Sequence, residues 1–313
     1  MMKQEIIKLI TSIAIIFPSF LLIDTLVGYI GGKALKNLPD FGNEICKINY
    51  RLNRVKTDMI IVGSSRARYH YHSDILSDSI NMLLGTNYSI YNSGIDGLFI
   101  DCNTCAVECI LNRYKPKLII FETNDREFKI DKSQKRLCRY EPFYQNNSII
   151  KDYFTRMDWK ENMKIHINMY RFNSKVVNII GCFLRQSTPD NGYYPRYRTM
   201  YETIDLKKNK PSKSNHFFNS YSIDSFNKMV RLCDNLNIKL IIATSPRYKP
   251  KGDNELIRSI CNKHNTPYIE LFNIDFFNNH PELFYDNSHL NNDGATIYTQ
   301  MFFEELKPYL KGL

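Results

Sequence analysis

Short apolar runs alternate along this chain with longer segments of helical periodicity. The runs lie at residues 59–62, 88–92, 117–121, 238–244 and 267–272, and the helical segments at about 73–84, 99–114, 222–235, 253–264 and 293–310. Most of the runs are apolar at consecutive positions, so both faces of each strand must be covered. Strands that alternate with helices in this way predict a parallel β-sheet with helices on both faces.

This pattern places the chain in the α/β class. We expect a flavodoxin-like, three-layer α/β/α domain over residues 58–313, preceded by an N-terminal transmembrane helix. Between about residues 126 and 220 the strand–helix alternation stops, and we interpret this polar, aromatic-rich region as an insertion into the domain.

The N-terminal segment is long and apolar. Residues 9–23 carry no charge, and residues 6–30 are mostly apolar, which at about 1.5 Å per residue exceeds the ~30 Å hydrocarbon core of a bilayer. A cleavable signal peptide is the alternative, but only Gly31-Gly32-Lys33-Ala34 follows, with no A-x-A-like site for cleavage. We therefore predict an uncleaved anchor over residues 1–32 and a basic stalk over residues 33–57. Lysines flank the segment on both sides, so charge counting does not orient it.

The net charge and the cysteine spacing limit the kinds of partner and ligand that we expect. The chain has 42 Lys and Arg against 32 Asp and Glu, a formal net charge of +10, but no long basic block, zinc-finger spacing or RNA-recognition signature. We therefore expect an acidic polymer or a membrane surface rather than nucleic acid. Cys102, Cys105 and Cys109 share one helix face and are expected to be buried thiols. No metal and no cofactor is predicted.

Small and polar residues follow the predicted strands. Ser65 comes after the first strand, Gly94 after the second and Asn124 after the third, while Asp286 and His289 lie on a loop after the last. In parallel sheets such positions meet at one edge, where sites form. An aspartate three residues before a histidine can reach the imidazole Nδ1 and leave Nε2 free to accept a proton from a serine. Each residue could alone be an ordinary turn residue, and their joint order is what points to a site.

These residues resemble the ordered blocks of the SGNH (GDSL-type) hydrolase superfamily. The matching blocks are Gly63-Ser64-Ser65, Asn92-Ser93-Gly94, Thr123-Asn124-Asp125 and Asp286-Asn287-Ser288-His289. The resemblance implies catalytic roles for Ser65 as nucleophile, His289 as base and Asp286 as its orienting carboxylate. It also implies an oxyanion hole formed by Ser65, Gly94 and Asn124.

The first block departs from the family's usual Gly-Asp-Ser, because Ser64 stands in place of the aspartate. A Gly-Ser-Ser block behind an N-terminal anchor is similar to envelope proteins that move or remove acyl groups on polymers, such as the D-alanyl-transfer protein of teichoic acid synthesis and the alginate acetylation proteins. This similarity implies an extracytoplasmic domain.

The insertion contains a cluster of aromatic and basic side chains at residues 192–198. Aromatic faces suit sugar rings and arginines suit acidic groups, so we interpret Tyr194, Arg196, Tyr197 and Arg198 as candidate substrate-binding residues. An ordinary solvated loop over the core is the alternative.

Together these features predict a membrane-anchored serine esterase or O-acyltransferase acting on acyl esters, expected to be acetyl, of a cell-envelope glycan. Two alternatives stay open. One is a non-catalytic glycan-binding or assembly subunit that keeps the fold, and the other is a lipid-acting esterase.

Overall fold

A five-stranded parallel sheet forms the centre of the larger part of the chain. The computed structural model describes residues 2–129, 134–184, 190–200 and 217–313. The strands are β1 (Met59–Val62), β2 (Ile90–Asn92), β3 (Leu118–Glu122), β4 (Lys239–Thr244) and β5 (Tyr268–Glu270). Their order across the sheet is β2-β1-β3-β4-β5, and every neighbouring pair is parallel. This is the flavodoxin-like order, so the predicted fold class is confirmed.

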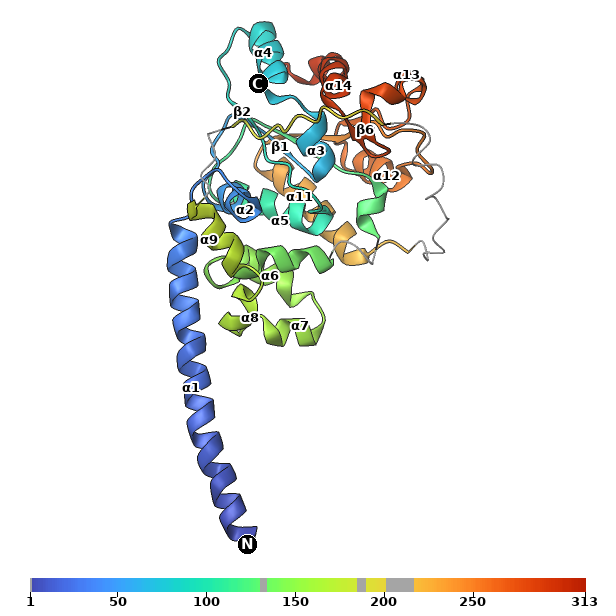
Figure 1. Cartoon of the computed structure of the whole chain (residues 1–313). Coiled ribbons are helices and arrows are strands. Elements are labelled where there is room, and N and C mark those ends of the chain that lie inside the picture. Colours follow the sequence, from blue (N-terminus) through green and yellow to red (C-terminus); the bar gives the residue numbers. More distant parts are fainter. Residues whose placement is uncertain (1, 130–133, 185–189, 201–216) are drawn as a thin grey trace. The chain divides into compact units, whose positions relative to one another are not determined.

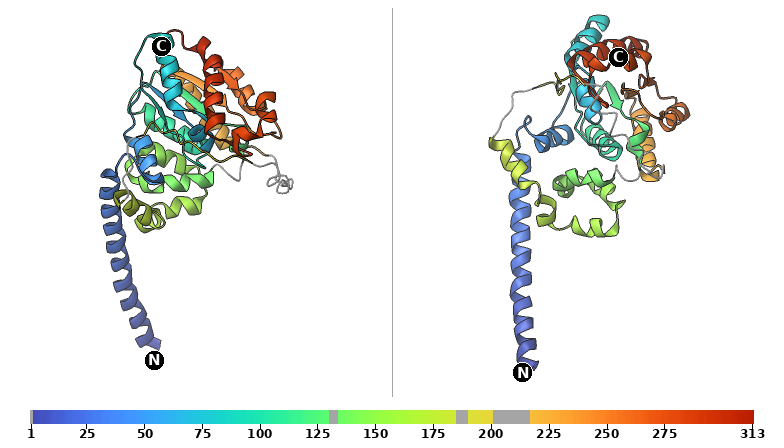
Figure 2. Two further views of the ribbon diagram at one scale, coloured as in Figure 1. Left: turned by 45° about the horizontal axis from the view of Figure 1, so that its top comes forward. Right: turned by 45° about the vertical axis from the view of Figure 1, so that its right-hand side comes forward.

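Helices cover both faces of this sheet (Figures 1 and 2). One face carries α3 (Ser65–His70), α4 (Ser73–Leu84) and α14 (Asn292–Leu306), and the other carries α5 (Ile100–Leu111), α11 (Ser220–Asn235) and α12 (Glu255–His264). Alternate residues of each strand point to opposite faces, so Ile120 joins the α14 side whereas Phe121 contacts Phe226 of α11.

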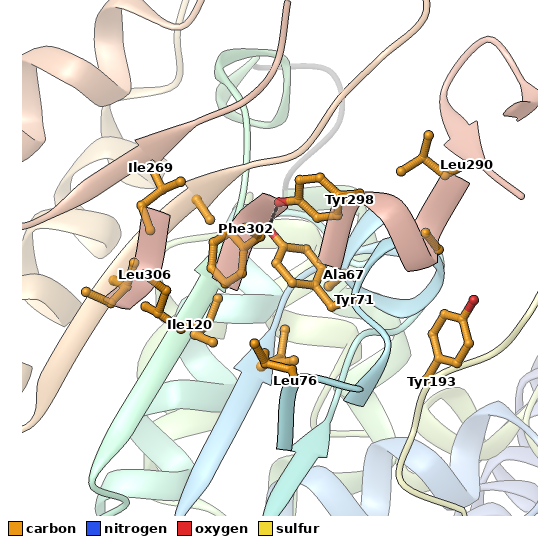
Figure 3. Packing of buried hydrophobic residues seen from close by; sticks show 14 of the residues in the cluster. Ala67, Tyr71, Leu76, Ile120, Tyr193, Ile269, Leu290, Tyr298, Phe302 and Leu306 are labelled. Atoms are coloured by element: carbon orange, nitrogen blue, oxygen red, sulfur yellow. Dashed lines mark hydrogen bonds between the residues drawn. The ribbon is translucent and has the colours of Figure 1, made fainter. Parts of the chain in front are cut away.

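Aromatic residues of α14 anchor it to the sheet and to α3 (Figure 3). Tyr298 and Phe302 are fully buried beside Tyr71, and the Tyr298 hydroxyl donates a hydrogen bond of 2.8 Å to the Tyr71 hydroxyl. Burial of one such side chain contributes about 1.5–3 kcal/mol. The paired hydroxyls satisfy polar atoms that would otherwise be costly to bury. The core therefore fixes α14 against α3 and against Tyr71, the residue that follows α3.

The remaining elements of this part are short. They comprise η1 (Asp125–Phe128), α13 (Asp275–Asn279), η3 (Pro281–Leu283), the antiparallel pair β6 (Phe284–Asp286) and β7 (His289–Leu290), and η4 (Lys307–Tyr309).

The chain divides into two compact units. Unit 1 contains residues 1–49 and 139–187, and unit 2 contains residues 50–138 and 188–313. Besides the end of η2 (Gln134–Asn146), unit 1 holds α1 (Met2–Lys36), most of α2 (Glu44–Asn53), α6 (Ser148–Thr155), α7 (Trp159–Lys164), α8 (Asn168–Phe172) and α9 (Val176–Leu184). The central part of the region predicted as an insertion thus joins the N-terminal residues. Of that region, residues 130–133, 185–189 and 201–216 lie outside the described residues.

A disulfide links Cys46 of α2 to Cys182 of α9 within unit 1.

Residues 33–57, expected as a stalk, contain the end of α1 and the whole of α2, whose Ile45, Ile48 and Leu52 are buried. In α1, residues 4–36 have a mean hydropathy of 2.4 over their most apolar window, none of it buried, so this helix is long and apolar enough to cross a membrane.

Candidate active site

The turn after β1 presents two serines. Gly63 directly follows the strand, and a Cβ built on it would lie 2.7 Å from the Ala67 Cβ and 2.8 Å from the Glu122 carbonyl oxygen, so the tight approach requires glycine. Ser65 is the first residue of α3. The N–H of a first helical residue has no carbonyl one turn earlier to bind, so the Ser65 N–H remains available to a ligand.

The two serine hydroxyls face different surroundings. Ser65 is partly exposed, and its Oγ lies 2.8 Å from Nε2 of His289. Ser64 is buried, and its Oγ donates a hydrogen bond of 3.0 Å to Oε1 of Glu127. The geometry therefore joins Ser65, and not Ser64, to the histidine.

Asp286 and His289 are held together by their own tight turn. The carboxylate oxygens of Asp286 lie 2.9 Å from Nδ1 of His289, and Oδ1 also accepts the N–H groups of Ser288 and His289 at 2.8 and 3.1 Å. Burial opposes ionisation of Asp286, but these hydrogen bonds outweigh it and lower the pKa of the carboxyl below its usual value. An ionised carboxylate only accepts hydrogen bonds, so Nδ1 carries the proton and the Nε2 lone pair faces Ser65.

Asn124 lies beside the serine turn at the end of β3. Its Nδ2 donates to Oε1 of Glu127 at 3.3 Å, the same oxygen that accepts from Ser64. Its Oδ1 accepts the Arg126 N–H at 3.1 Å and so caps η1. Because the side-chain amide has a second N–H, Asn124 can still donate to a ligand.

Gly94 packs closely on α3, but its N–H is already used. A Cβ at this position would lie 2.4 Å from the Arg68 backbone nitrogen, so only glycine allows the contact. The Gly94 N–H donates to Oδ1 of Asn92 at 3.0 Å. Of the three expected oxyanion donors, Gly94 is therefore the one that would have to share its hydrogen with a side chain.

A segment over residues 190–200 crosses the site. It begins at β2, where the Asn92 N–H donates to the Asn191 carbonyl at 2.8 Å, and it passes α3, where the Tyr194 N–H donates to the Arg68 carbonyl at 3.1 Å. It ends at β6, where the Met200 N–H donates to the Phe284 carbonyl at 2.8 Å. Three of the four predicted substrate-binding residues, Tyr194, Arg196 and Tyr197, therefore lie near Tyr69, whose ring contacts that of His289.

Those residues line a cavity of about 460 Å³. Its walls are formed by Arg68, Tyr69, Tyr194, Pro195, Arg196, Tyr197 and Tyr285. The Arg196 guanidinium stacks 4.0 Å from the Tyr69 ring centre and 4.4 Å from that of Tyr285, and the Tyr69 ring lies 5.4 Å from the His289 ring. Tyr69 thus connects the cavity to the histidine, whereas Ser65 and His289 themselves are not part of its lining. Arg198 is exposed and is not part of its lining.

Sequence reasoning missed the carboxylates beneath the site. Glu127 is buried, and burial, together with the nearby Glu122 charge, raises its pKa to about 8 in spite of Arg66 and the Ser64 hydrogen bond. The sequence does hold a signal for these buried carboxylates, because Glu122 is a charged residue directly after the apolar run of β3.

Cys102, Cys105 and Cys109 are buried in α5 as expected. Within the described ranges, no group of three or more His, Cys, Asp or Glu side chains is arranged to hold a metal ion.

Comparison with known proteins gives only distant structural likenesses. No model of a known protein family matches the chain. No curated protein matches it either. Among solved structures, it is similar to a candidate lipolytic protein of the G-D-S-L family from Desulfitobacterium hafniense DCB-2 (10% identity, TM-score 0.38, 80% of this chain and 99% of that one). It is also similar to the lipase/acylhydrolase from Enterococcus faecalis, with 11% identity and a TM-score of 0.37 over 82% of this chain and 97% of that one. A third similar structure is a two-domain esterase active on acetylated mannans, with 10% identity and a TM-score of 0.38 over 82% of this chain and 49% of that one. The evidence for a function therefore comes from the chain's own geometry.

The raised pKa of Glu127 predicts a pH-dependent stability. Between about pH 4.5 and 8 the folded state keeps a proton that the unfolded state releases, so the free energy of unfolding should fall as pH rises through this window. Glu127→Gln removes this titration and should make the protein more stable than wild type at pH 8, with little difference near pH 4.5. Urea unfolding of the full chain at several pH values measures this. The exposed Glu304→Gln is the control, and an unchanged pH slope in Glu127→Gln would contradict the prediction.

Proposed function

We propose that this protein is a membrane-anchored serine esterase or O-acyltransferase that acts on acyl esters, expected to be acetyl, of a cell-envelope glycan. The observation that carries the proposal is the continuous hydrogen-bond chain from Ser65 Oγ to His289 Nε2 and from His289 Nδ1 to Asp286. A hydroxyl, a base and an orienting carboxylate in this order are the parts needed for nucleophilic acyl transfer.

Acylation would begin when the Ser65 Oγ attacks the carbonyl carbon of the ester. His289 Nε2 takes the hydroxyl proton, and the ionised Asp286 stabilises the imidazolium that forms. The carbonyl oxygen becomes an oxyanion, for which the Ser65 N–H and the Asn124 amide are the candidate donors, with Gly94 as a shared third. Collapse of the intermediate breaks the ester C–O bond, His289 returns the proton to the leaving alkoxide, and the acyl group stays on Ser65.

Deacylation distinguishes the two activities. Water that attacks the acyl-enzyme gives an esterase, and a sugar hydroxyl gives a transferase, with His289 as base in either case. A glycan substrate is supported by the cavity beside His289, because the Tyr194 and Tyr197 rings offer faces for sugar rings and Arg196 offers a charge for acidic groups.

An uncleaved anchor is supported by the contacts of α1. Gly28 and Gly31 lie so close to Asn168 and Phe172 of α8 that a Cβ would come within 2.3 and 2.5 Å of their side chains, so the end of this helix is an integral part of unit 1. The Cys46–Cys182 disulfide supports an extracytoplasmic location, because disulfides persist in oxidising compartments.

Substitutions in the proposed triad test the proposal. Ser65→Ala and His289→Ala should each lower kcat toward a small activated acyl ester by about 10³-fold or more, and the double variant should be little worse, because the residues act as one unit. Asp286→Ala should cost less, since imidazole retains some function without its carboxylate.

Ser64→Ala is the matched control and should keep substantial activity, because the Ser64 hydroxyl faces Glu127 and not His289. If Ser64→Ala is inactive and Ser65→Ala active, the nucleophile is misassigned. If all of these variants match wild type and glycan binding persists, the protein is a binding or assembly subunit.

Asn124→Ala tests the proposed oxyanion hole. Loss of one preorganised donor should lower kcat by about 10²–10³-fold and change KM little. The lost cap on η1 should reduce the free energy of unfolding by only about 0.5–2 kcal/mol. Steady-state kinetics and thermal unfolding separate these effects, and a large stability loss with normal turnover of the folded fraction would assign Asn124 a purely structural role.

A further inference from the structure

The exposed part of α1 has the length of a bilayer core. Residues 4–23 are all exposed, and at about 1.5 Å per residue this run is about 30 Å long, equal to the ~30 Å hydrocarbon thickness. The first residue after it is Asp24, which is partly covered by other residues of unit 1. The proposed anchor therefore leaves the hydrocarbon near Asp24.

The start of α8 is fixed at this same point. The Asp24 carboxylate accepts the N–H groups of Asn168 and Met169 at 3.2 and 2.7 Å and the Asn168 side-chain amide at 2.8 Å. One turn further along α1, Gly28 admits the Asn168 side chain at close range. α8 lies beside α1 (Figure 1). Because these bonds tie α8 to Asp24, α8 would begin at the depth where the proposed anchor enters the headgroup layer.

The residues around this point expose apolar side chains. Four of them lie on α7, in the turn after it and at the beginning of α8, with exposed fractions of 64, 63, 37 and 39%: Trp159, Met163, Ile167 and Met169. The Tyr170 hydroxyl donates to Glu161 at 2.6 Å and ties α7 to α8. Lys160 and Lys164 are exposed on α7 beside the apolar residues. Tryptophan and lysine next to apolar side chains are typical of segments that lie in a membrane interface.

A cavity on the polar side of Asp24 adds positive charge. It has a volume of about 450 Å³ and is lined by Tyr29, Lys33 and Lys36 of α1 and by Arg171 of α8, among others. The Arg171 guanidinium is buried, and its terminal nitrogens already donate to the Ile165 carbonyl and to the Gln145 and Asn168 side chains, so Arg171 contributes its positive charge rather than a donor. Lys33 and Lys36 are exposed at this cavity and match the phosphate of a phospholipid headgroup.

We infer that residues 159–172, comprising α7, α8 and the turn between them, form a second membrane contact that lies in the interface of the bilayer crossed by α1. Its ligand is phospholipid: the parts of the acyl chains next to the headgroups meet the apolar side chains of α7 and α8, and a headgroup phosphate meets Lys33 and Lys36 of α1. This inference rests on the proposed anchor. The contact would fix the depth and tilt of unit 1 at the membrane.

The chain's only tryptophan, Trp159, is a built-in probe of this contact. Full-length protein is reconstituted into phosphatidylcholine–phosphatidylglycerol vesicles, with or without bromine atoms near the headgroup end of the acyl chains. At an expected depth of about 5–10 Å below the headgroup boundary, bromine should quench Trp159 emission about twofold, and acrylamide in the water should quench it little. Equal emission in the two kinds of vesicle, with full access to acrylamide, would overturn the inference.

A matched variant moves the probe to another place in unit 1. In Trp159→Phe/Phe183→Trp the tryptophan replaces an exposed phenylalanine of α9, next to the Cys182 that is linked to Cys46 beyond the polar end of α1, and its emission should be the same in both kinds of vesicle. Equal bromine quenching at both positions would overturn the assignment to α7 and α8. Carbonate extraction separates the two proposals: a chain that stays with the vesicles while Trp159 is not quenched contradicts only the interfacial contact. Release of the chain by carbonate would overturn the anchor and the contact together.

Discussion

A buried ion pair beneath the site ties together the elements that carry it. The Arg66 guanidinium, one residue after Ser65 on α3, lies 3.0 Å from the Glu122 carboxylate at the end of β3, and both side chains are buried. Glu122 also accepts hydrogen bonds from the backbone and hydroxyl of Ser245, directly after β4. A buried charge without partners is strongly destabilising, so α3 and the ends of β3 and β4 must keep this one arrangement. The position of Ser65 follows from it.

The same group of residues reaches the histidine turn through His70. Burial lowers the pKa of His70 well below its usual value, so its imidazole is neutral. Its Nε2 accepts the Leu290 N–H at 3.0 Å, which leaves the proton on Nδ1 to be donated to Ser245 Oγ at 2.8 Å. Leu290 follows His289 directly. The serine turn and the histidine turn, far apart in sequence, are thus held by one buried set of hydrogen bonds.

Much of the fold, and the residue types of the site, could be predicted from the sequence, because strand–helix alternation and the Asp286–His289 spacing are local patterns. The strand order agrees with the predicted class. What the sequence could not supply depends on contacts between distant segments. The contact of Ser64 with Glu127, the contact of Ser65 with His289 and the bond from the Gly94 N–H to the Asn92 side chain are visible only in the folded structure. The pairing of Cys46 with Cys182 spans 136 residues of sequence and had no local signal.

The proposed nucleophile can be tested without knowledge of the natural substrate. A fluorophosphonate probe reacts with a serine hydroxyl only when a neighbouring base activates it. We expect that the full-length protein is labelled, that peptide mapping places the label on Ser65, that Ser64→Ala is labelled like wild type and that Ser65→Ala is not labelled. Absence of label from the folded wild-type protein, or label that persists in Ser65→Ala, would contradict the activation of Ser65 by His289.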